Sequence, residues 1–226
     1  MENRLKYLSD HYDNNLSVAA ISAFTSYQLA KEDEYPFCPN PLKFVHKSTL
    51  GIHIGYQEDL LSDIIQAAEK LDGNWNPMGK ATKSGFQTRG NLFSEKGDSF
   101  SALKEILTKE IQTYYNKFKD SDSKFIEYWP DDIVLEGWFV RLEKKGYQSP
   151  HIHPDGWLSG VVYLELTEPD SSDQGAIEFG ISGWSLPVIR DNLPSLLINP
   201  AVGDIILFPS SLFHRTIPTN SLGSRC

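Results

Sequence analysis

The sequence predicts an α+β protein, mainly β, in which N-terminal helices precede a sandwich or barrel of short strands. Three observations support this expectation. Apolar residues recur with a period near 3.6 in the first half of the chain. After Pro130, short apolar segments alternate with turns rich in Gly, Pro, Asp and Asn. A length of 226 residues suffices for one large domain with a helical cap.

Two amphipathic helices are expected in the first third of the chain. The first covers residues 16–24 after Asn15, and the second covers 57–71, with Gly73 as its stop signal. One stripe of the second helix is apolar and consists of Leu60, Leu61, Ile64, Ile65, Ala68 and Leu71. Prolines break the pattern between the two helices, and residues 43–54 have β character.

Residues 74–98 are polar and irregular, and a loop of this length in a compact domain is often functional. A third helix follows, capped by Ser99 or Ser101, and continues to about Phe118. Its inward-facing residues are expected to be Leu103, Ile106, Leu107, Ile111 and Tyr114. The strands expected after Pro130 are Ile133–Leu142, His151–His153, Leu158–Leu166, Ala176–Ile181, Ser195–Ile198, Asp204–Pro209 and His214–Ile217.

Composition excludes several classes of partner. The formal net charge is −9, and the chain lacks the clustered Lys and Arg that duplex nucleic acid requires. No stretch approaches the roughly 18 apolar residues of a membrane span, and the N-terminus has no apolar signal core. Cys38 and Cys226 are the two cysteines, which suits a reducing compartment. We therefore expect a cytoplasmic protein without nucleic-acid or membrane partners; an oligomer stays open.

Two histidines one residue apart, His151 and His153, are the most informative feature of the sequence. Alternate side chains of a strand point the same way, so both imidazoles can reach one ion. His214 follows the apolar segment that ends in Phe208-Pro209, and it is the best candidate for a third ligand from a distant strand. Three ligands with open positions indicate a catalytic metal site rather than a closed structural one. The alternative is that hydrogen bonds inside the core satisfy these imidazoles.

The motifs around these histidines resemble a known family. The segments HIHPDGWLSGVVYL, GAIEF and NPAVGDIILFPSSLFHRTIP with a trailing Arg are similar to 2-oxoglutarate/Fe(II)-dependent oxygenases. They are most similar to a subgroup that often follows tetratricopeptide repeats, and GKATKSGFQTRGNLF resembles its upstream region. The resemblance covers residues 35–226 and implies a double-stranded β-helix (jelly roll) with one iron at its open end. Residues 1–34 would form an N-terminal helical segment, with the N-terminal helices packed on one sheet.

By position, the resemblance implies His151 as the first metal ligand and His214 as the distal one. The second ligand of the family is usually Asp or Glu, but His153 occupies that place here. Either all three histidines bind the metal, as in cupin-like dioxygenases, or the frame slides by two and pairs His153 with Asp155. We favour the first alternative, because the family pattern places H-x-H at this point.

Three further residues are implied as cosubstrate ligands. Arg225 matches the family residue that pairs with the far carboxylate of 2-oxoglutarate, and its planar fork suits a carboxylate; the alternative is a surface arginine. Ser159 and Tyr163 share parity on an expected strand, so both can point into the barrel, although Tyr163 fits the core equally well. The family continues with a further strand through Arg225, so we expect the last strand of the jelly roll to be missing.

Other polar and aromatic residues receive weaker functional interpretations. Trp157 could wall the pocket, but simple packing is favoured. Arg141 is expected to face solvent, with a buried carboxylate partner as the alternative. An ordinary solvated loop is favoured over a lid or a substrate-recognition element for four residues: Gln87, Thr88, Arg89 and Asn91.

The function implied by the resemblance is that of a dioxygenase, an oxidoreductase that uses Fe(II) and 2-oxoglutarate to hydroxylate a C–H bond. Its substrate would be an unidentified small molecule or protein side chain. One alternative is a cupin-like three-His dioxygenase that needs no 2-oxoglutarate. The other is a non-catalytic jelly roll that binds Zn²⁺ or a partner, since three histidines also suit zinc.

Overall fold

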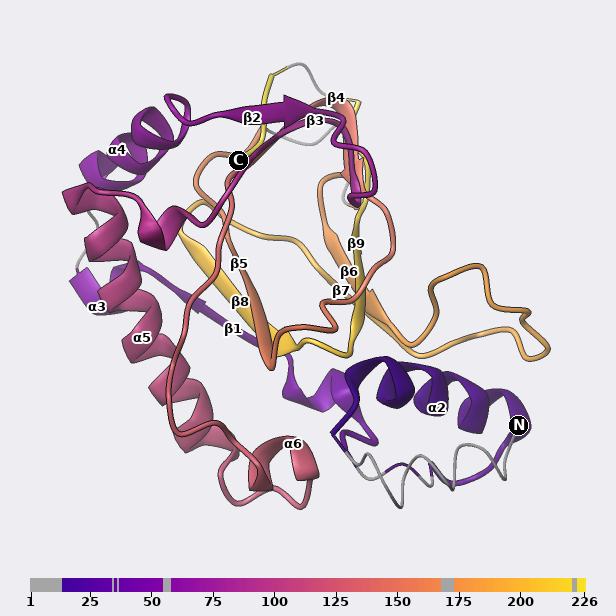
Figure 1. The fold of residues 1–226 in the computed structure, drawn as a ribbon. Coiled ribbons are helices and arrows are strands. Elements are labelled where there is room, and N and C mark those ends of the chain that lie inside the picture. The colour runs from indigo at the N-terminus through magenta and orange to yellow at the C-terminus, as the bar shows by residue number, and fades with distance from the viewer. Residues whose placement is uncertain (1–13, 34, 36, 55–57, 168–172, 221–222) are drawn as a thin grey trace.

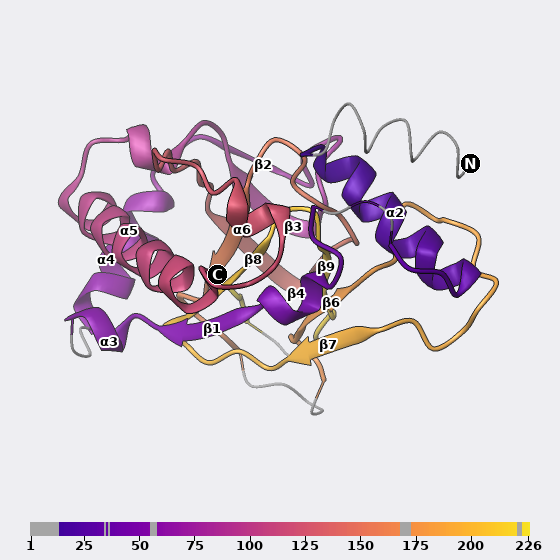
Figure 2. The ribbon, with the colours of Figure 1, turned by 90° about the horizontal axis from the view of Figure 1, so that it is seen from below.

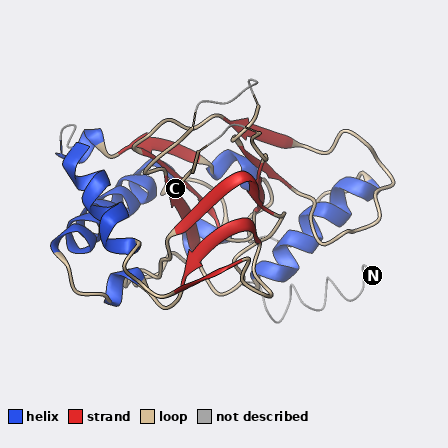
Figure 3. Ribbon diagram, turned by 90° about the horizontal axis from the view of Figure 1, so that it is seen from above, coloured by secondary structure: helices blue, strands red, loops and turns tan. Residues whose placement is uncertain are grey.

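The computed structural model describes residues 14–33, 35, 37–54, 58–167, 173–220 and 223–226. The described strands form three antiparallel sheets of three strands each, and helices lie outside them on two sides (Figure 1; Figure 3). None of the helices within these ranges is long and apolar enough to cross a membrane. Of the expected N-terminal segment 1–34, residues 1–13 and 34 lie outside the described ranges.

The first sheet has the order β1-β8-β5, formed by His46–Thr49, Asp204–Pro209 and Leu158–Val162. All six residues of β8 are buried, because strands flank it on both edges and apolar layers cover both faces. Ile205 and Leu207 belong to the core shared with the helices, whereas Ile206 and Phe208 belong to a core on the opposite face. A strand buried on both faces is a continuous apolar run, as the sequence shows.

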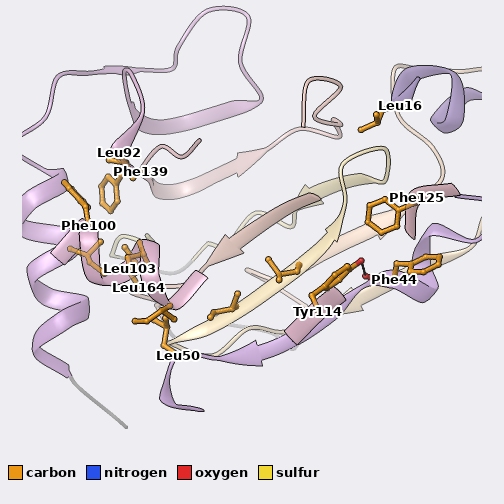
Figure 4. Close-up of a cluster of buried hydrophobic side chains, with 14 of the residues drawn as sticks. Leu16, Phe44, Leu50, Leu92, Phe100, Leu103, Tyr114, Phe125, Phe139 and Leu164 are labelled. Atoms are coloured by element: carbon orange, nitrogen blue, oxygen red, sulfur yellow. Dashed lines mark hydrogen bonds between the residues drawn. The ribbon is translucent and has the colours of Figure 1, made fainter. Parts of the chain in front are cut away.

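Helices α4 (Glu58–Ala68) and α5 (Asp98–Phe118) cover the outer face of this sheet (Figure 2). The apolar stripes predicted for both helices lie in this core, where Ile64, Ala68 and Ile106 are buried. Tyr114 of α5 donates a hydrogen bond to the carbonyl of Phe44 at 2.7 Å, so its hydroxyl is satisfied within the apolar cluster (Figure 4).

The second sheet, β7-β6-β9, faces the inner side of the first. Its strands are Ser195–Ile198, Ile177–Gly180 and Phe213–Thr216. Residues of β6 and β8, together with two residues that follow β5 and β8, form one buried cluster between the two sheets: Tyr163, Ile177, Phe179, Ile206, Phe208 and Leu212. This layer is called the sandwich interior below.

The third sheet is β2-β3-β4, formed by Gly73–Trp75, Thr82–Thr88 and Val140–Gln148. The last residues of the chain join it to the first sheet. Arg225 exchanges two backbone hydrogen bonds with Leu142, at 2.8 and 2.9 Å. The next residue, Cys226, donates from its backbone N–H to the Glu165 carbonyl at 3.0 Å. The C-terminal segment therefore lies between β4 and the chain that follows β5.

Helix α2 (Leu16–Leu29) lies on the other side of the sheets from α4 and α5 (Figure 2). Asn15 caps it by accepting a hydrogen bond from Val18 N–H at 3.0 Å, as expected for an Asn before an apolar periodic segment. The Gln28 side chain accepts from the backbone N–H groups of Ile189 and Arg190 at 2.6 and 2.8 Å. This helix therefore fixes the loop between β6 and β7.

Short helical elements complete the described chain: η1 (Pro41–Phe44), α3 (Gly51–Ile54), η2 (Leu92–Ser94) and α6 (Lys124–Glu127). The predicted β character of 43–54 is right for β1 alone, and the end of that segment is helical. The pairing of β1 with β8 ends at Thr49–Asp204, where β8 itself begins. Among the described residues, no strand pairs with residues 51–54 beyond that point.

Three other expectations about local structure were wrong. Residues 74–98 contain the rest of the β2–β3 hairpin and η2, because β4 supplies a partner that is distant in sequence. Helix α5 begins at Asp98 with Gly97 as its N-cap, so Ser99 and Ser101 lie inside its first turn. The strand expected from Ile133 begins only at Val140. The backbone before it is hydrogen-bonded to the Asn91 side chain and to the backbone of Leu92 instead of to a neighbouring strand.

We predict that Phe125→Ala lowers the free energy of unfolding by about 3–5 kcal/mol. Phe125 is fully buried and packs against the rings of Phe37, Phe44 and Trp157. Tyr128→Ala, at an exposed site just after the same short helix, should cost less than about 1 kcal/mol. Urea unfolding followed by circular dichroism measures both; equal losses would contradict the assignment of Phe125 to the core.

Candidate metal centre

His151 and His214 lie directly opposite one another in an isolated antiparallel bridge. The N–H of each donates to the carbonyl of the other at 3.1 Å. Their ring centroids are 4.2 Å apart. His214 belongs to β9, where its strand neighbour is Phe179, and cross-strand partners share a face of the sheet. Because Phe179 is fully buried in the sandwich interior, His214 points into that layer.

The third imidazole comes from His153, whose backbone N–H donates to the Ser210 carbonyl at 3.0 Å. Its ring centroid lies 4.9 Å from that of His151 and 5.1 Å from that of His214. One nitrogen from each ring lies within 4.8 Å of the other two, a spacing at which three ligands can share one ion. Asp155, the alternative to His153, is exposed and does not belong to this group.

The backbone orients two of the three rings. Nδ1 of His151 lies 2.7 Å from the Ser149 carbonyl, and Nδ1 of His214 lies 3.1 Å from the Leu212 carbonyl. A carbonyl only accepts hydrogen bonds, so Nδ1 carries the proton in both neutral rings and the lone pair lies on Nε2. Such a bond from the second nitrogen is typical of histidines that bind metals.

Electrostatics favours the neutral, metal-binding form of all three rings. Burial, reinforced by the neighbouring imidazoles, lowers the pKa of His214 well below its ordinary value. Burial also lowers the pKa of His151, against the opposing effect of its backbone hydrogen bonds. Burial, followed by repulsion from His151 and Lys80, lowers the pKa of His153 to about 4. The lone pairs are therefore available at neutral pH.

Aromatic side chains surround the three imidazoles. The ring of Phe208 lies 4.5 Å from that of His214, centroid to centroid, and Phe179 packs on Phe208 at 4.9 Å. Trp138 lies on the other side, with its ring 5.6 Å from that of His153. The His214 side thus adjoins the dry interior, whereas Trp138 is 41% exposed and marks the side open to solvent.

Arg225 lies in the same interior. It is 6% exposed, and its guanidinium carbon lies 5.0 Å from the centre of the Tyr163 ring. One guanidinium nitrogen donates to the Gly175 carbonyl. Among the described residues, no carboxylate lies within 4 Å of this guanidinium. The prediction of a surface arginine, kept as an alternative, is wrong.

Tyr163 and Ser159 both lie on the inner side of the chain at β5, as their parity predicts. Tyr163 is buried beneath Arg225, and burial raises its pKa to about 12 against the opposing effect of the guanidinium. Ser159 pairs with Phe208 in the sheet, and its Oγ lies 2.6 Å from Oγ of Ser210. Ser210 in turn accepts from the backbone N–H of His153, so Ser159 adjoins the metal-binding chain segment.

Of the weaker interpretations made from the sequence, one is confirmed by the structure and another is wrong for two residues. Trp157 packs on Phe37 and Phe125 and donates from Nε1 to the Phe125 carbonyl, so the packing interpretation is confirmed. Arg141 is partly exposed and pairs with Glu69. The solvated-loop interpretation is wrong for the two of the four residues that are buried in β3, Gln87 and Thr88. The side chains of Thr88 and Asn91 form hydrogen bonds with the backbone of residues 135–139, the segment that contains Trp138.

Trp138 is the residue that sequence reasoning missed at this site. The sequence predicts it inside the strand Ile133–Leu142, whereas the strand begins only at Val140. The available signal was its even parity with Val140, which pairs with Gln87 on β3. No local pattern could indicate that its ring would lie beside His153, because the two segments meet only through the tertiary fold.

Part of the chain is similar to a known protein family. Residues 136–226, less than half of the chain, match the model of a family described as "Putative 2OG-Fe(II) oxygenase". This stretch contains all three histidines and Arg225. The cofactors of that family, Fe(II) and 2-oxoglutarate, are the ones predicted from the sequence. A comparison with curated proteins gave no significant match.

Similar solved structures include HygX from Streptomyces hygroscopicus with nickel and 2-oxoglutarate, at a TM-score of 0.50 and 14% identity over 80% of this chain and 79% of HygX. HygX with nickel, 2-oxoglutarate and hygromycin B has a TM-score of 0.50 and 15% identity over the same shares. A prolyl-4-hydroxylase from Pseudomonas putida has a TM-score of 0.49 and 13% identity over 91% of this chain and 93% of its own.

At these identities the likeness concerns the fold. The chain has a mixed fold of helices and antiparallel sheets, similar to that of 2-oxoglutarate/Fe(II) oxygenases. The predicted mixture of helices with a mainly antiparallel β part is thus confirmed at that level. The complete double-stranded β-helix, the division at residue 34 and the missing last strand stay predictions.

We predict that the metal-free protein loses stability as the pH falls from about 6.5, the ordinary pKa of an unfolded imidazole, towards about 4. The unfolded chain then binds protons that folded His153 does not, so stability rises with pH across this window. His153→Gln should flatten the dependence, by at most about 3 kcal/mol over the window. Urea unfolding in a chelator at several pH values measures it, and an unchanged slope in the variant would refute the assignment.

Proposed function

We propose that this protein is a 2-oxoglutarate-dependent dioxygenase that holds Fe(II) with His151, His153 and His214 and hydroxylates a C–H bond of its substrate. The observation that carries the proposal is the combination of three converging neutral imidazoles with a buried arginine in the same interior. The match to the oxygenase family over residues 136–226 supports it.

The donor set fits a divalent transition metal. Imidazole is a ligand that suits iron, zinc, copper and nickel, and three ligands leave positions open for further groups. The three side chains carry no charge, so a divalent cation here would keep its full charge until an anion binds beside it. A dianionic chelate such as 2-oxoglutarate would therefore neutralise the metal that the histidines leave positive.

Arg225 separates this proposal from a cupin-like dioxygenase without 2-oxoglutarate. A buried charge is costly unless it is paired, and no carboxylate of the described residues pairs with this one. The far carboxylate of 2-oxoglutarate would supply the missing partner in the bidentate geometry that guanidinium favours. A three-His oxygenase or a zinc module without such an anion leaves the buried guanidinium without a role.

The residues of the chain would divide the work as follows. The three histidines hold the metal, Arg225 orients the cosubstrate, and the Tyr163 ring positions the guanidinium. Phe179 and Phe208 exclude water from the side of His214. When bound, Fe(II) with 2-oxoglutarate supplies the oxidation itself: O₂, 2-oxoglutarate and a C–H bond give succinate, CO₂ and a C–OH group. The protein contributes position and dryness.

Anaerobic titration tests the metal and the cosubstrate together. We expect Fe(II) with 2-oxoglutarate to give a weak visible charge-transfer band, and oxygen to convert the cosubstrate to succinate. His214→Ala should abolish both signals, whereas His46→Gln, on β1 outside the cluster, should keep them. Succinate formation without the band, or full signals in His214→Ala, would refute the three-histidine centre. Metal bound without any effect of 2-oxoglutarate would favour the cupin or zinc alternative.

A second prediction concerns Arg225. Arg225→Met should weaken 2-oxoglutarate binding on the order of 100-fold and leave metal binding within about threefold, because the lost contact is a buried charge pair. Arg215→Met is the matched control, since Arg215 is half exposed and pairs with Glu178. Calorimetric titration of the Ni²⁺-loaded variants measures both constants. Equal 2-oxoglutarate affinity in Arg225→Met and the parent would exclude Arg225 as the carboxylate partner.

A further inference from the structure

Trp138 combines two properties that rarely occur together in an ordinary surface residue. Its ring lies 5.6 Å from that of His153 with an angle of 52° between the planes, yet 41% of the residue remains exposed. Trp157, which follows the histidine motif in the sequence, is instead packed in the core with its Nε1 satisfied. The two tryptophans that flank the motif in sequence therefore have different environments.

The chain holds Trp138 firmly from both neighbours. Gly137 N–H donates to Oδ1 of Asn91 at 3.0 Å, and Gly137 accepts from Leu92 N–H at 2.9 Å. On the other side, Phe139 N–H donates to Oγ1 of Thr88 at 2.9 Å. The backbone at Trp138 is therefore fixed, and less ordering of the chain is needed when its side chain binds a partner.

Gly137 adds a steric requirement to this arrangement. A Cβ at this position would lie 2.6 Å from Cε2 of Phe93, so any larger residue would force the Phe93 ring to shift. Asn91, which precedes η2, also donates from Nδ2 to the Leu135 carbonyl at 2.9 Å. Thr88 and Asn91, for which the sequence favoured a solvated loop, thus fix the backbone at Trp138.

We propose that Trp138 is the substrate platform of this site, on which a saturated ring of the substrate stacks beside His153. An indole face is electron-rich and apolar, and it attracts the weakly positive C–H edge of a ring. A saturated ring also carries aliphatic C–H bonds, which an oxidising centre beside it could attack. The inference rests on the proposed function, because the centre at His153 gives the stacked ring its reaction partner.

The test uses two compounds that each contain a saturated ring: N-acetyl-L-proline amide represents a prolyl residue, and methyl β-D-glucopyranoside represents a sugar. Saturation-transfer NMR with the Zn²⁺- and 2-oxoglutarate-loaded protein detects ring protons that touch the site. We expect at least one ring to bind the parent, and Trp138→Ala to weaken that binding about tenfold or more. Trp138→Phe should restore part of it. The compound that binds identifies a prolyl or a glycosyl source.

Trp75→Ala is the matched control, because Trp75 is 54% exposed but lies on β2. It should bind the ring as the parent does. Binding of neither ring to the parent, or equal binding by Trp138→Ala and the parent, would overturn the proposal. The anaerobic Fe(II) and 2-oxoglutarate band, measured on the same proteins, separates the two hypotheses. A band in the parent and in Trp138→Ala with no ring effect refutes the platform alone, whereas no band in any of them refutes the oxygenase.

Discussion

The antiparallel bridge between His151 and His214 is the interaction on which the candidate centre depends. Two backbone hydrogen bonds of 3.1 Å bring together residues that are far apart in sequence. Directly opposite residues of such a pair place their side chains on one face, a few ångströms apart. The convergence of the imidazoles therefore follows from strand pairing, and His153 joins them through the Ser210 carbonyl. A slip of one residue would turn His214 away from the interior.

The sandwich interior gives this bridge its chemical character. Phe179 and Phe208 adjoin His214, and burial keeps its imidazole neutral at the pH where a metal must bind. The same burial makes it energetically costly to keep the Arg225 guanidinium charged, and it lowers the pKa of this group. Apolar surroundings favour a neutral imidazole but disfavour a charge without a partner. The same buried interior therefore keeps the histidines ready to bind a metal cation and leaves the Arg225 guanidinium ready to bind an anion.

The sequence predicted the parts of the molecule in which local pattern and burial agree. The apolar stripes of α4 and α5 and the buried apolar run of β8 follow directly from apolar spacing. The pattern failed where a distant partner decides the structure. Residues 82–88 look like polar loop, but pairing with β4 makes them a strand that buries Thr82 and Thr88. Residues 133–139 look like strand, but Asn91 and Thr88 take their hydrogen bonds.

By itself, the sequence determined which chemistry is available: imidazoles at H-x-H spacing, a third histidine after an apolar strand, and an arginine suited to a carboxylate. Side-chain type and strand parity are local properties, so one chain suffices to read them. Only the tertiary structure decided that three rings approach within ligand distance, that Arg225 is buried without an acidic partner, and that Trp138 faces His153. Those facts depend on which strands pair and which faces meet, and pairing between distant segments leaves no local signature in the order of residues.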